Sequence, residues 1–295
     1  MAIPRRYTLR FIGLVVLLFF TAFFFVPIIW LFLAPTKTDG QLLSNSPFAF
    51  GSLSTLAHTF HRIVDYSGHS VLIWLKNSAI YSFGGTALAI VAAIPAGYGL
   101  ALTEFIGRRT LLSITLVVMI MPATALVLPL FLEINKLGLY GTVWSLILPF
   151  GFFPFGVYLA YIYFSSTIPK DLLAAARIDG ANEWNVFRHI AVPLARPIIA
   201  LVGFFAFVAS WNNFFLPFVM TYDNSQYPLQ IGIQQLIGST ASFNPANYSA
   251  GASVTVLHRP DLAMAVIIAI APVLIVFLFA QRTLVSGMLA GATKE

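Results

Sequence analysis

Residues 169–197, PKDLLAAARIDGANEWNVFRHIAVPLARP, form the longest charge-bearing run between two apolar stretches of the chain. Pro169 suits the first turn of a helix, where its missing N–H is not needed. The run Ala174–Ala176 of the strongest helix former then favours a helix from Leu172 to Ile178. The spacing i, i+3, i+4, i+7 gives this helix one shared side, formed by Asp171, Ala174, Ala175 and Ile178.

The second half of the stretch predicts a turn and another short helix. Gly180 can adopt the left-handed conformation that ends the first helix. Asn182 can cap a second helix, which we expect Pro193 to close. An amphipathic helix lying on a membrane surface is the ordinary interpretation of such a segment. The alternative is a docking surface, because a face made mostly of alanine lets the backbone of another protein approach closely.

The rest of the chain is too apolar for an ordinary soluble domain. Of its 295 residues, 59% are hydrophobic and 9% are charged, whereas soluble domains have about 25% charged residues. Recurring uncharged apolar runs of about 18 residues or more predict an all-α membrane protein with six transmembrane helices. The first run is too long for the core of a signal peptide, which has about 7–15 residues. We place the spans at approximately residues 11–34, 77–102, 110–132, 141–165, 197–222 and 262–280.

The distribution of basic residues predicts the orientation of these spans. Eleven of the 16 Lys and Arg residues fall on the side that holds both termini and residues 169–197. Lys and Arg are enriched in cytoplasmic loops. We therefore expect both termini and the 169–197 segment to be cytoplasmic.

The six spans contain no Asp, Glu, Lys, Arg or His. Ion pumps and ion-coupled carriers usually keep such groups in the membrane as relays or binding sites. Their absence from the spans therefore disfavours an ion pump or ion-coupled carrier. The chain also lacks the G-x-x-x-x-G-K-[ST] phosphate loop. If transport is active, its energy has to arrive through another polypeptide, and residues 169–197 are the candidate contact.

The most polar group within the spans is Trp211-Asn212-Asn213. Amides in hydrocarbon need hydrogen-bond partners, which neighbouring helices could supply. Alternatively, an aromatic face can pack on sugar C–H groups while amides bond sugar hydroxyls. With Asn77 and Tyr81 of the second span, these residues are the candidate substrate path, and a pore without charge suits a neutral polyhydroxylated cargo.

Two other patterns favour structural roles. Small residues recur at every fourth position of the second span and predict close helix packing; they are Gly85, Ala89, Ala93 and Gly97. The chain has no cysteine, and His58, His61 and His69 lie in a loop without supporting carboxylates. We therefore expect no metal site.

AAARIDGA followed by IAVPLARP resembles the cytoplasmic "EAA" loop of ABC-importer permeases, whose pattern is EAA, three residues, G, and later I-x-L-P. In that family the loop is the coupling helix that inserts into a cleft of the ATPase subunit. The resemblance implies ATPase-coupling roles for Ala174, Ala175, Ala176, Asp179, Gly180 and Ala181. Ala174 takes the place of the Glu that names the motif, and Val192 takes the place of Leu before Pro193.

Four further stretches resemble the second permease subunit of maltose- and trehalose-type carbohydrate importers. They are WLKNSAIYS at 74–82, WNNFFLPFVM at 211–220, YPLQIGIQQLIG at 227–238 and QRTLVSGMLAGATK at 281–294. The last matches a tail that runs along the ATPase, which implies contacts from Gly287, Gly291 and Lys294. The matches keep their order over nearly the whole chain from Trp74.

The resemblance implies one subunit of a heteromeric importer that carries out no covalent chemistry. Its partners would be a second permease subunit, two ATPase subunits, an extracytoplasmic solute-binding protein, the lipid bilayer and a sugar. No nucleic acid is implied, and ATP and Mg would bind the ATPase subunits. Polyamine or glycerol phosphate import and an ion-coupled secondary carrier are the alternatives.

The implied organisation divides the chain into segments on the two sides of the membrane. They are a cytoplasmic N-terminus (1–10), a first span (11–34), an extracytoplasmic loop (35–76), a permease core (77–285) with coupling loop 169–197 and outer loop 223–260, and a cytoplasmic tail (286–295).

Overall fold

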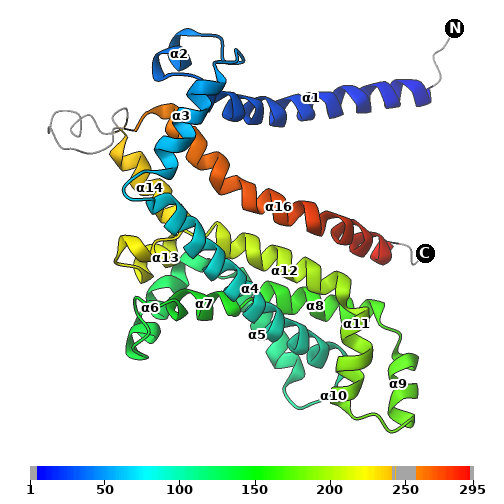
Figure 1. The fold of residues 1–295 in the computed structure, drawn as a ribbon. Helices are drawn as coiled ribbons and strands as arrows, with labels where there is room; N and C mark the ends of the chain where they lie inside the picture. Colours follow the sequence, from blue (N-terminus) through cyan, green and yellow to red (C-terminus); the bar gives the residue numbers. More distant parts are fainter. Residues whose placement is uncertain (1–4, 241–242, 244–256, 293–295) are drawn as a thin grey trace. The chain divides into compact units, whose positions relative to one another are not determined.

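The computed structural model describes residues 5–240, 243 and 257–292, and within these ranges it is built of helices (Figure 1). Its one β contact there is an isolated bridge between Thr240 and Leu257. The all-α prediction is therefore confirmed. The chain divides into two compact units: unit 1 comprises residues 1–71 and 233–270, and unit 2 comprises residues 72–232 and 271–295.

Unit 1 is built around α3 (Leu53–Val64) and the first turn of α16 (Arg259–Ala292). Arg62 Nε lies 3.2 Å from the carboxylate of Asp261, whose side chain is fully buried. This pairing matters because a buried carboxylate without a partner would be strongly destabilising. Unit 1 also contains α1 (Arg5–Leu33), the turn Ala34–Thr36, α2 (Asp39–Ser44) and residues 233–239 of α14 (Leu229–Ser239).

The first span is a continuous helix with an unusual environment. None of the most apolar window of α1 is buried within the chain. Between Phe11 and Phe32 its large apolar side chains are exposed, apart from the half-buried Leu31. Such a surface is stable only against lipid tails or another protein, as expected of a transmembrane helix.

Unit 2 is organised around α4 (Ser70–Leu102), which packs against α7 (Trp144–Gly151) and α8 (Pro154–Thr167). A Cβ on Gly97 would overlap Ala160 and come within 2.9 Å of the backbone of α8. A Cβ on Gly85 would come within 2.7 Å of Phe150. Ala89 and Ala93 are fully buried in the same helix. The predicted small-residue face is therefore a helix-packing face.

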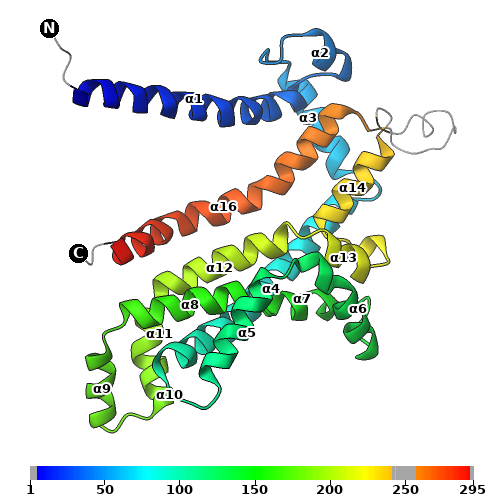
Figure 2. The same cartoon turned by 180° about the vertical axis from the view of Figure 1, so that it is seen from behind.

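Among the other helices of unit 2, α12 runs alongside α8, and several shorter helices lie toward the two ends of α4 (Figure 2). α9, α10 and α11 lie at one end, and α6 and α13 lie at the other. Their bounds are α5 (Arg108–Ile120), α6 (Val127–Lys136), α9 (Lys170–Ile178), α10 (Glu183–Val186), α11 (Val192–Leu194), α12 (Arg196–Trp211) and α13 (Phe215–Met220).

The structure corrects the spans predicted at 110–132 and 197–222, which are not single helices. The first is broken near Pro122, where the chain bends by 104° between Ile120 and Ala123. The second ends at Trp211, and a separate short helix follows. The described residues contain four helices able to cross a membrane, or up to six if two bent pairs, 108–120 with 123–136 and 183–194 with 196–211, are each one span. The second span also begins earlier than predicted, since α4 starts at Ser70.

Candidate coupling loop and substrate path

The first half of the 169–197 segment has the local structure that the sequence predicts. α9 runs from Lys170 to Ile178, with Pro169 just outside it at the capping position. Gly180 has φ +85°, in the left-handed region that favours glycine. The Ala181 N–H donates to the Ala176 carbonyl at 3.0 Å, and the Gly180 N–H donates to the Arg177 carbonyl at 3.1 Å. This pair of bonds is the Schellman motif, and it satisfies carbonyls that the helix end would otherwise leave unpaired.

In the second half, the prediction for Asn182 is confirmed and that for Pro193 is wrong. Asn182 Oδ1 accepts from the Asn185 N–H at 2.8 Å and caps α10. Pro193 does not close the helical segment, because α11 contains it and ends at Leu194. A π-helical turn at Phe187–Ala191 precedes it. Pro193 thus lies in the first turn of a new helix, where a missing N–H is tolerated.

The predicted coupling residues of α9 and its turn divide between an exposed and a packed side. Asp171, Ala174, Ala175 and Ile178 share the exposed side, and Ile178 is 85% exposed. Asp179 and Gly180 are exposed as well. By contrast, Leu173 is buried, and Ala176 and Ala181 pack on the same core beside it.

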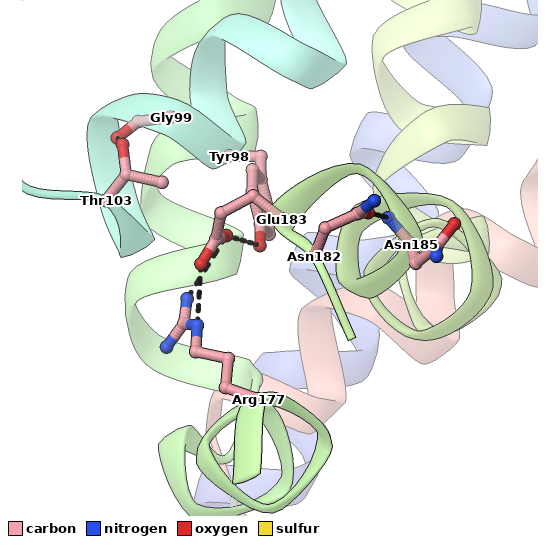
Figure 3. A network of polar contacts seen from close by, with 7 residues as sticks. All are labelled: Tyr98, Gly99, Thr103, Arg177, Asn182, Glu183 and Asn185. Carbon is pink, nitrogen blue, oxygen red and sulfur yellow. Dashed lines mark hydrogen bonds and ion pairs between the residues drawn. The ribbon is translucent and has the colours of Figure 1, made fainter. Parts of the chain in front are cut away.

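A polar network ties this loop to the end of α4 (Figure 3). The Arg177 Nε donates to Glu183 Oε1 at 2.7 Å and its Nη2 donates to Oε2 at 3.3 Å, so the pair spans the Gly180 turn. The Tyr98 hydroxyl, at the far end of α4, donates to the same Oε2 at 3.0 Å. One carboxylate therefore joins α9, α10 and α4.

The strength of this network differs between its two parts. Arg177 and Glu183 are 38% and 54% exposed, and exposed ion pairs typically contribute about 0–1 kcal/mol. Tyr98 is only 5% exposed, with its ring against Phe164 and Phe187 at centroid distances of 5.6 and 5.0 Å. The network therefore adds little stability but sets the orientation of the carboxylate.

The charge state of Glu183 follows from its partners. The hydrogen bond from Arg177 lowers the pKa of the Glu183 carboxyl below its usual 4.5, against the opposing effect of partial burial. Because this pKa is lowered, the ion pair between Glu183 and Arg177 is fully present above pH 4.5 and is lost as the pH falls below that value. Glu183 is therefore ionised throughout the physiological range.

Two of the predicted substrate-path residues already have partners in the 223–260 segment. The Asn77 amide donates to the carbonyls of Ser225 at 2.7 Å and Tyr227 at 3.0 Å. The Tyr81 hydroxyl donates to the Gln226 carbonyl at 2.9 Å. These side chains hold the start of the 223–260 segment against α4.

Two neighbours on the same face of α4 complete this arrangement. The indole N–H of Trp74 donates to the Asn224 side chain at 2.9 Å, and Ser78 Oγ accepts from the Leu229 N–H at 2.7 Å. We call these four bonding residues, Trp74, Asn77, Ser78 and Tyr81, the outer clamp. It was missed from the sequence, although the i, i+3, i+4, i+7 spacing of these polar-tipped residues is a usable signal.

The break after α12 accounts for most of the Trp211-Asn212-Asn213 cluster. Trp211 is buried and stacks on Phe207 at 5.5 Å. Asn213 Oδ1 accepts from the Leu216 N–H, in the first turn of α13, at 3.1 Å. Asn212 is different, because its side chain is exposed and, within the described part of the chain, its backbone N–H alone is bonded, to the Val208 carbonyl at 3.1 Å. Of the five predicted residues, Asn212 is the one with its amide exposed and available.

The predicted tail contacts lie at the end of the described chain. Gly287 and Gly291 belong to the last turns of α16, and Lys294 lies outside the described residues. The pairing of Glu183 with Arg177 and Tyr98 was not predicted. Opposite charges three residues on either side of Gly180 are the signal that could have paired the first two.

Comparison with known proteins decides the family. The family model described as "Binding-protein-dependent transport system inner membrane component" matches residues 85–289. The chain belongs to this family. As a permease it is similar to the arabinooligosaccharides transport system permease protein of Halalkalibacterium halodurans, with 30% identity over 93% of each chain.

Two more relatives extend the comparison. The permease is 30% identical to the trehalose transport system permease protein of Mycobacterium tuberculosis, over 91% of this chain and 92% of the relative. Its fold matches a crystal structure of a bacterial ABC transporter involved in the import of the acidic polysaccharide alginate. That match has a TM-score of 0.80 and 23% identity, over 96% of this chain and 98% of the other. The permease therefore has the ABC-importer permease fold and is a transport subunit of the inner membrane.

Proposed function

We propose that this permease is the transmembrane subunit of an ATP-driven importer that brings a neutral mono-, di- or oligosaccharide into the cell. The observation that carries the proposal is the exposed side of α9, which the Gly180 turn and the packed Leu173 hold outward. Relatives named for arabinooligosaccharides and trehalose support a sugar as cargo. The charge-free spans favour a neutral sugar over a polyamine or glycerol phosphate.

The assembly would supply what this chain lacks. Two ATPase subunits would bind ATP and Mg, a second permease subunit would complete the pore, and a solute-binding protein would deliver the sugar outside the cell. The excess of basic residues beside both termini and residues 169–197 supports a cytoplasmic position for all three. Closure of the ATPases would pull on α9 and rock the spans between inward and outward states.

Reconstitution tests this proposal. The complex would be purified through a tag on this permease, placed in liposomes and given radiolabelled neutral and acidic oligosaccharides with its binding protein. We expect uptake of a neutral sugar that requires ATP and stops when the ATPase subunits are removed. Uptake at the same rate without nucleotide would show that the permease is a secondary carrier instead.

The exposed Asn212 gives a more local prediction. We expect Asn212→Ala to raise the KM for sugar uptake about 2- to 10-fold, the loss of one hydrogen bond, without lowering the melting temperature. Asn213→Ala is the matched control. It should lower the free energy of unfolding by about 1 kcal/mol, because the Leu216 N–H in the first turn of α13 loses its acceptor. An unchanged KM for Asn212→Ala would remove this residue from the substrate path.

A further inference from the structure

We propose that the Glu183 carboxylate is a positioning residue through which the coupling loop moves α4. Motion of α9 would then reach the outer clamp at the other end of the same helix. The proposal rests on the function proposed above. It adds the route by which ATP hydrolysis would change the structure at the extracytoplasmic side.

The carboxylate is the directional contact between the loop and α4. Arg177, in α9, donates two hydrogen bonds to it, and Tyr98, in α4, donates one. The forked guanidinium geometry fixes the plane of the carboxylate relative to α9. Tyr98 also packs in the apolar core, with its ring against Phe164 and Phe187, and such contacts tolerate sliding more readily than a charged hydrogen bond.

The second requirement is a stiff connection between the two sites. α4 is one unbroken helix of 33 residues, with Pro95 inside it. At a rise of 1.5 Å per residue, Tyr81 and Tyr98 lie about 25 Å apart along its axis. At the Tyr81 end, the outer clamp binds residues 224–229 with hydrogen bonds of 2.7–3.0 Å. A shift of the helix along its axis would therefore displace this outer segment.

The third requirement is that the contact of Glu183 with Arg177 and Tyr98, which we call the Glu183 joint, transmits motion of α9 to α4 and contributes little to the stability of the fold. Its ion pair is largely exposed and adds little stability. Tyr98→Phe removes only a hydroxyl and keeps the ring between Phe164 and Phe187. Tyr161→Phe in α8 is a matched control, because the Tyr161 hydroxyl has no hydrogen-bond partner within the described part of the chain.

The test measures sugar imported per ATP hydrolysed by the reconstituted complex, together with co-purification of the ATPase. Wild type must first show ATP-dependent uptake; if it does not, the proposed function fails and this inference fails with it. We expect Tyr98→Phe and Glu183→Ala to retain the ATPase and its hydrolysis. Sugar imported per ATP should fall by about fivefold or more in each, and Tyr161→Phe should match wild type.

Two further measurements distinguish transmission through the Glu183 contact from a general loss of structure in the variants. The double variant Tyr98→Phe/Glu183→Ala should lose no more than Glu183→Ala alone, because both act through one contact. Nucleotide should change hydrogen exchange of residues 224–229 in wild type and fail to do so in Tyr98→Phe. A wild-type ratio of sugar to ATP in both single variants, or losses that add in the double variant, would overturn the proposal.

Discussion

Replacing Gly180 by valine is expected to reduce ATP-driven uptake and co-purification of the ATPase more than any other single change in the coupling loop. Gly180 has φ +85°, and a side chain forced into this region costs about 1–3 kcal/mol. That cost lowers the population of the native turn about 5- to 150-fold. A Cβ at Gly180 would meet no atom within 4 Å, so the penalty arises from the backbone alone.

The consequence reaches both faces of the loop. If the turn opens, the two Schellman hydrogen bonds at Gly180 and Ala181 are lost. Arg177 and Glu183, which lie on either side of the turn, then separate as well. The exposed side of α9 would no longer be held in one orientation for a partner.

Asparagine at the same position is the matched control. Asparagine tolerates the left-handed conformation far better than valine, and the site is open to any side chain. We expect Gly180→Asn to retain most of the uptake and of the ATPase in pull-downs. Equal activity of the valine and asparagine variants would contradict the assigned role of this turn.

Gly97→Leu is expected to prevent the permease from folding. A Cβ at Gly97 would overlap Ala160 and crowd backbone atoms of α8, which cannot move aside as a flexible side chain could. Separating α4 from α8 would also expose the core that contains Ala93, Ala160 and Phe164. Overpacking alone costs about 1–3 kcal/mol, and the lost burial adds to it.

Gly99 provides the control in the same helix. Its Cβ would meet only Thr103 Oγ1, at 3.9 Å, and alanine is a better helix former than glycine by about 1 kcal/mol. We expect Gly99→Ala to purify as a monodisperse protein with an equal or higher melting temperature, and Gly97→Leu to give no folded protein. A normal melting temperature for Gly97→Leu would show that α4 and α8 do not pack as described.

Much of the fold could be predicted because the signals are local. Apolar length gives the helices, the four-residue spacing of small residues gives the packing face of α4, and glycine and asparagine give the turn at 180–182. The broken spans could not be predicted, because proline alone does not decide the outcome. α1, α4 and α16 continue through Pro27, Pro95 and Pro272, whereas the chain bends near Pro122. The difference depends on which neighbours satisfy the freed backbone groups.

The candidate site was predictable to a smaller extent. Alanine spacing correctly identifies the exposed side of α9, since that pattern depends on one helix alone. The hydrogen bonds of the outer clamp and the bond between Tyr98 and Glu183 connect residues that are at least 85 positions apart in the chain, so the sequence pattern of either helix does not identify the partner. Asn77 and Tyr81 were singled out for sugar contact because of their polar groups, and in the structure those groups donate to backbone carbonyls of residues 225–227.

The central claim is that α9 binds an ATPase subunit on the cytoplasmic side. A cysteine placed at Ile178 tests this claim most directly. The chain has no cysteine, so Ile178→Cys places a single thiol at a position that is 85% exposed. The measurement is cross-linking of this thiol to the ATPase subunit in membranes, combined with labelling of intact cells by a membrane-impermeant thiol reagent. The account predicts a cross-link to the ATPase and no labelling from outside. Labelling from outside, or no cross-link to any ATPase subunit in an assembled, transporting complex, would contradict it.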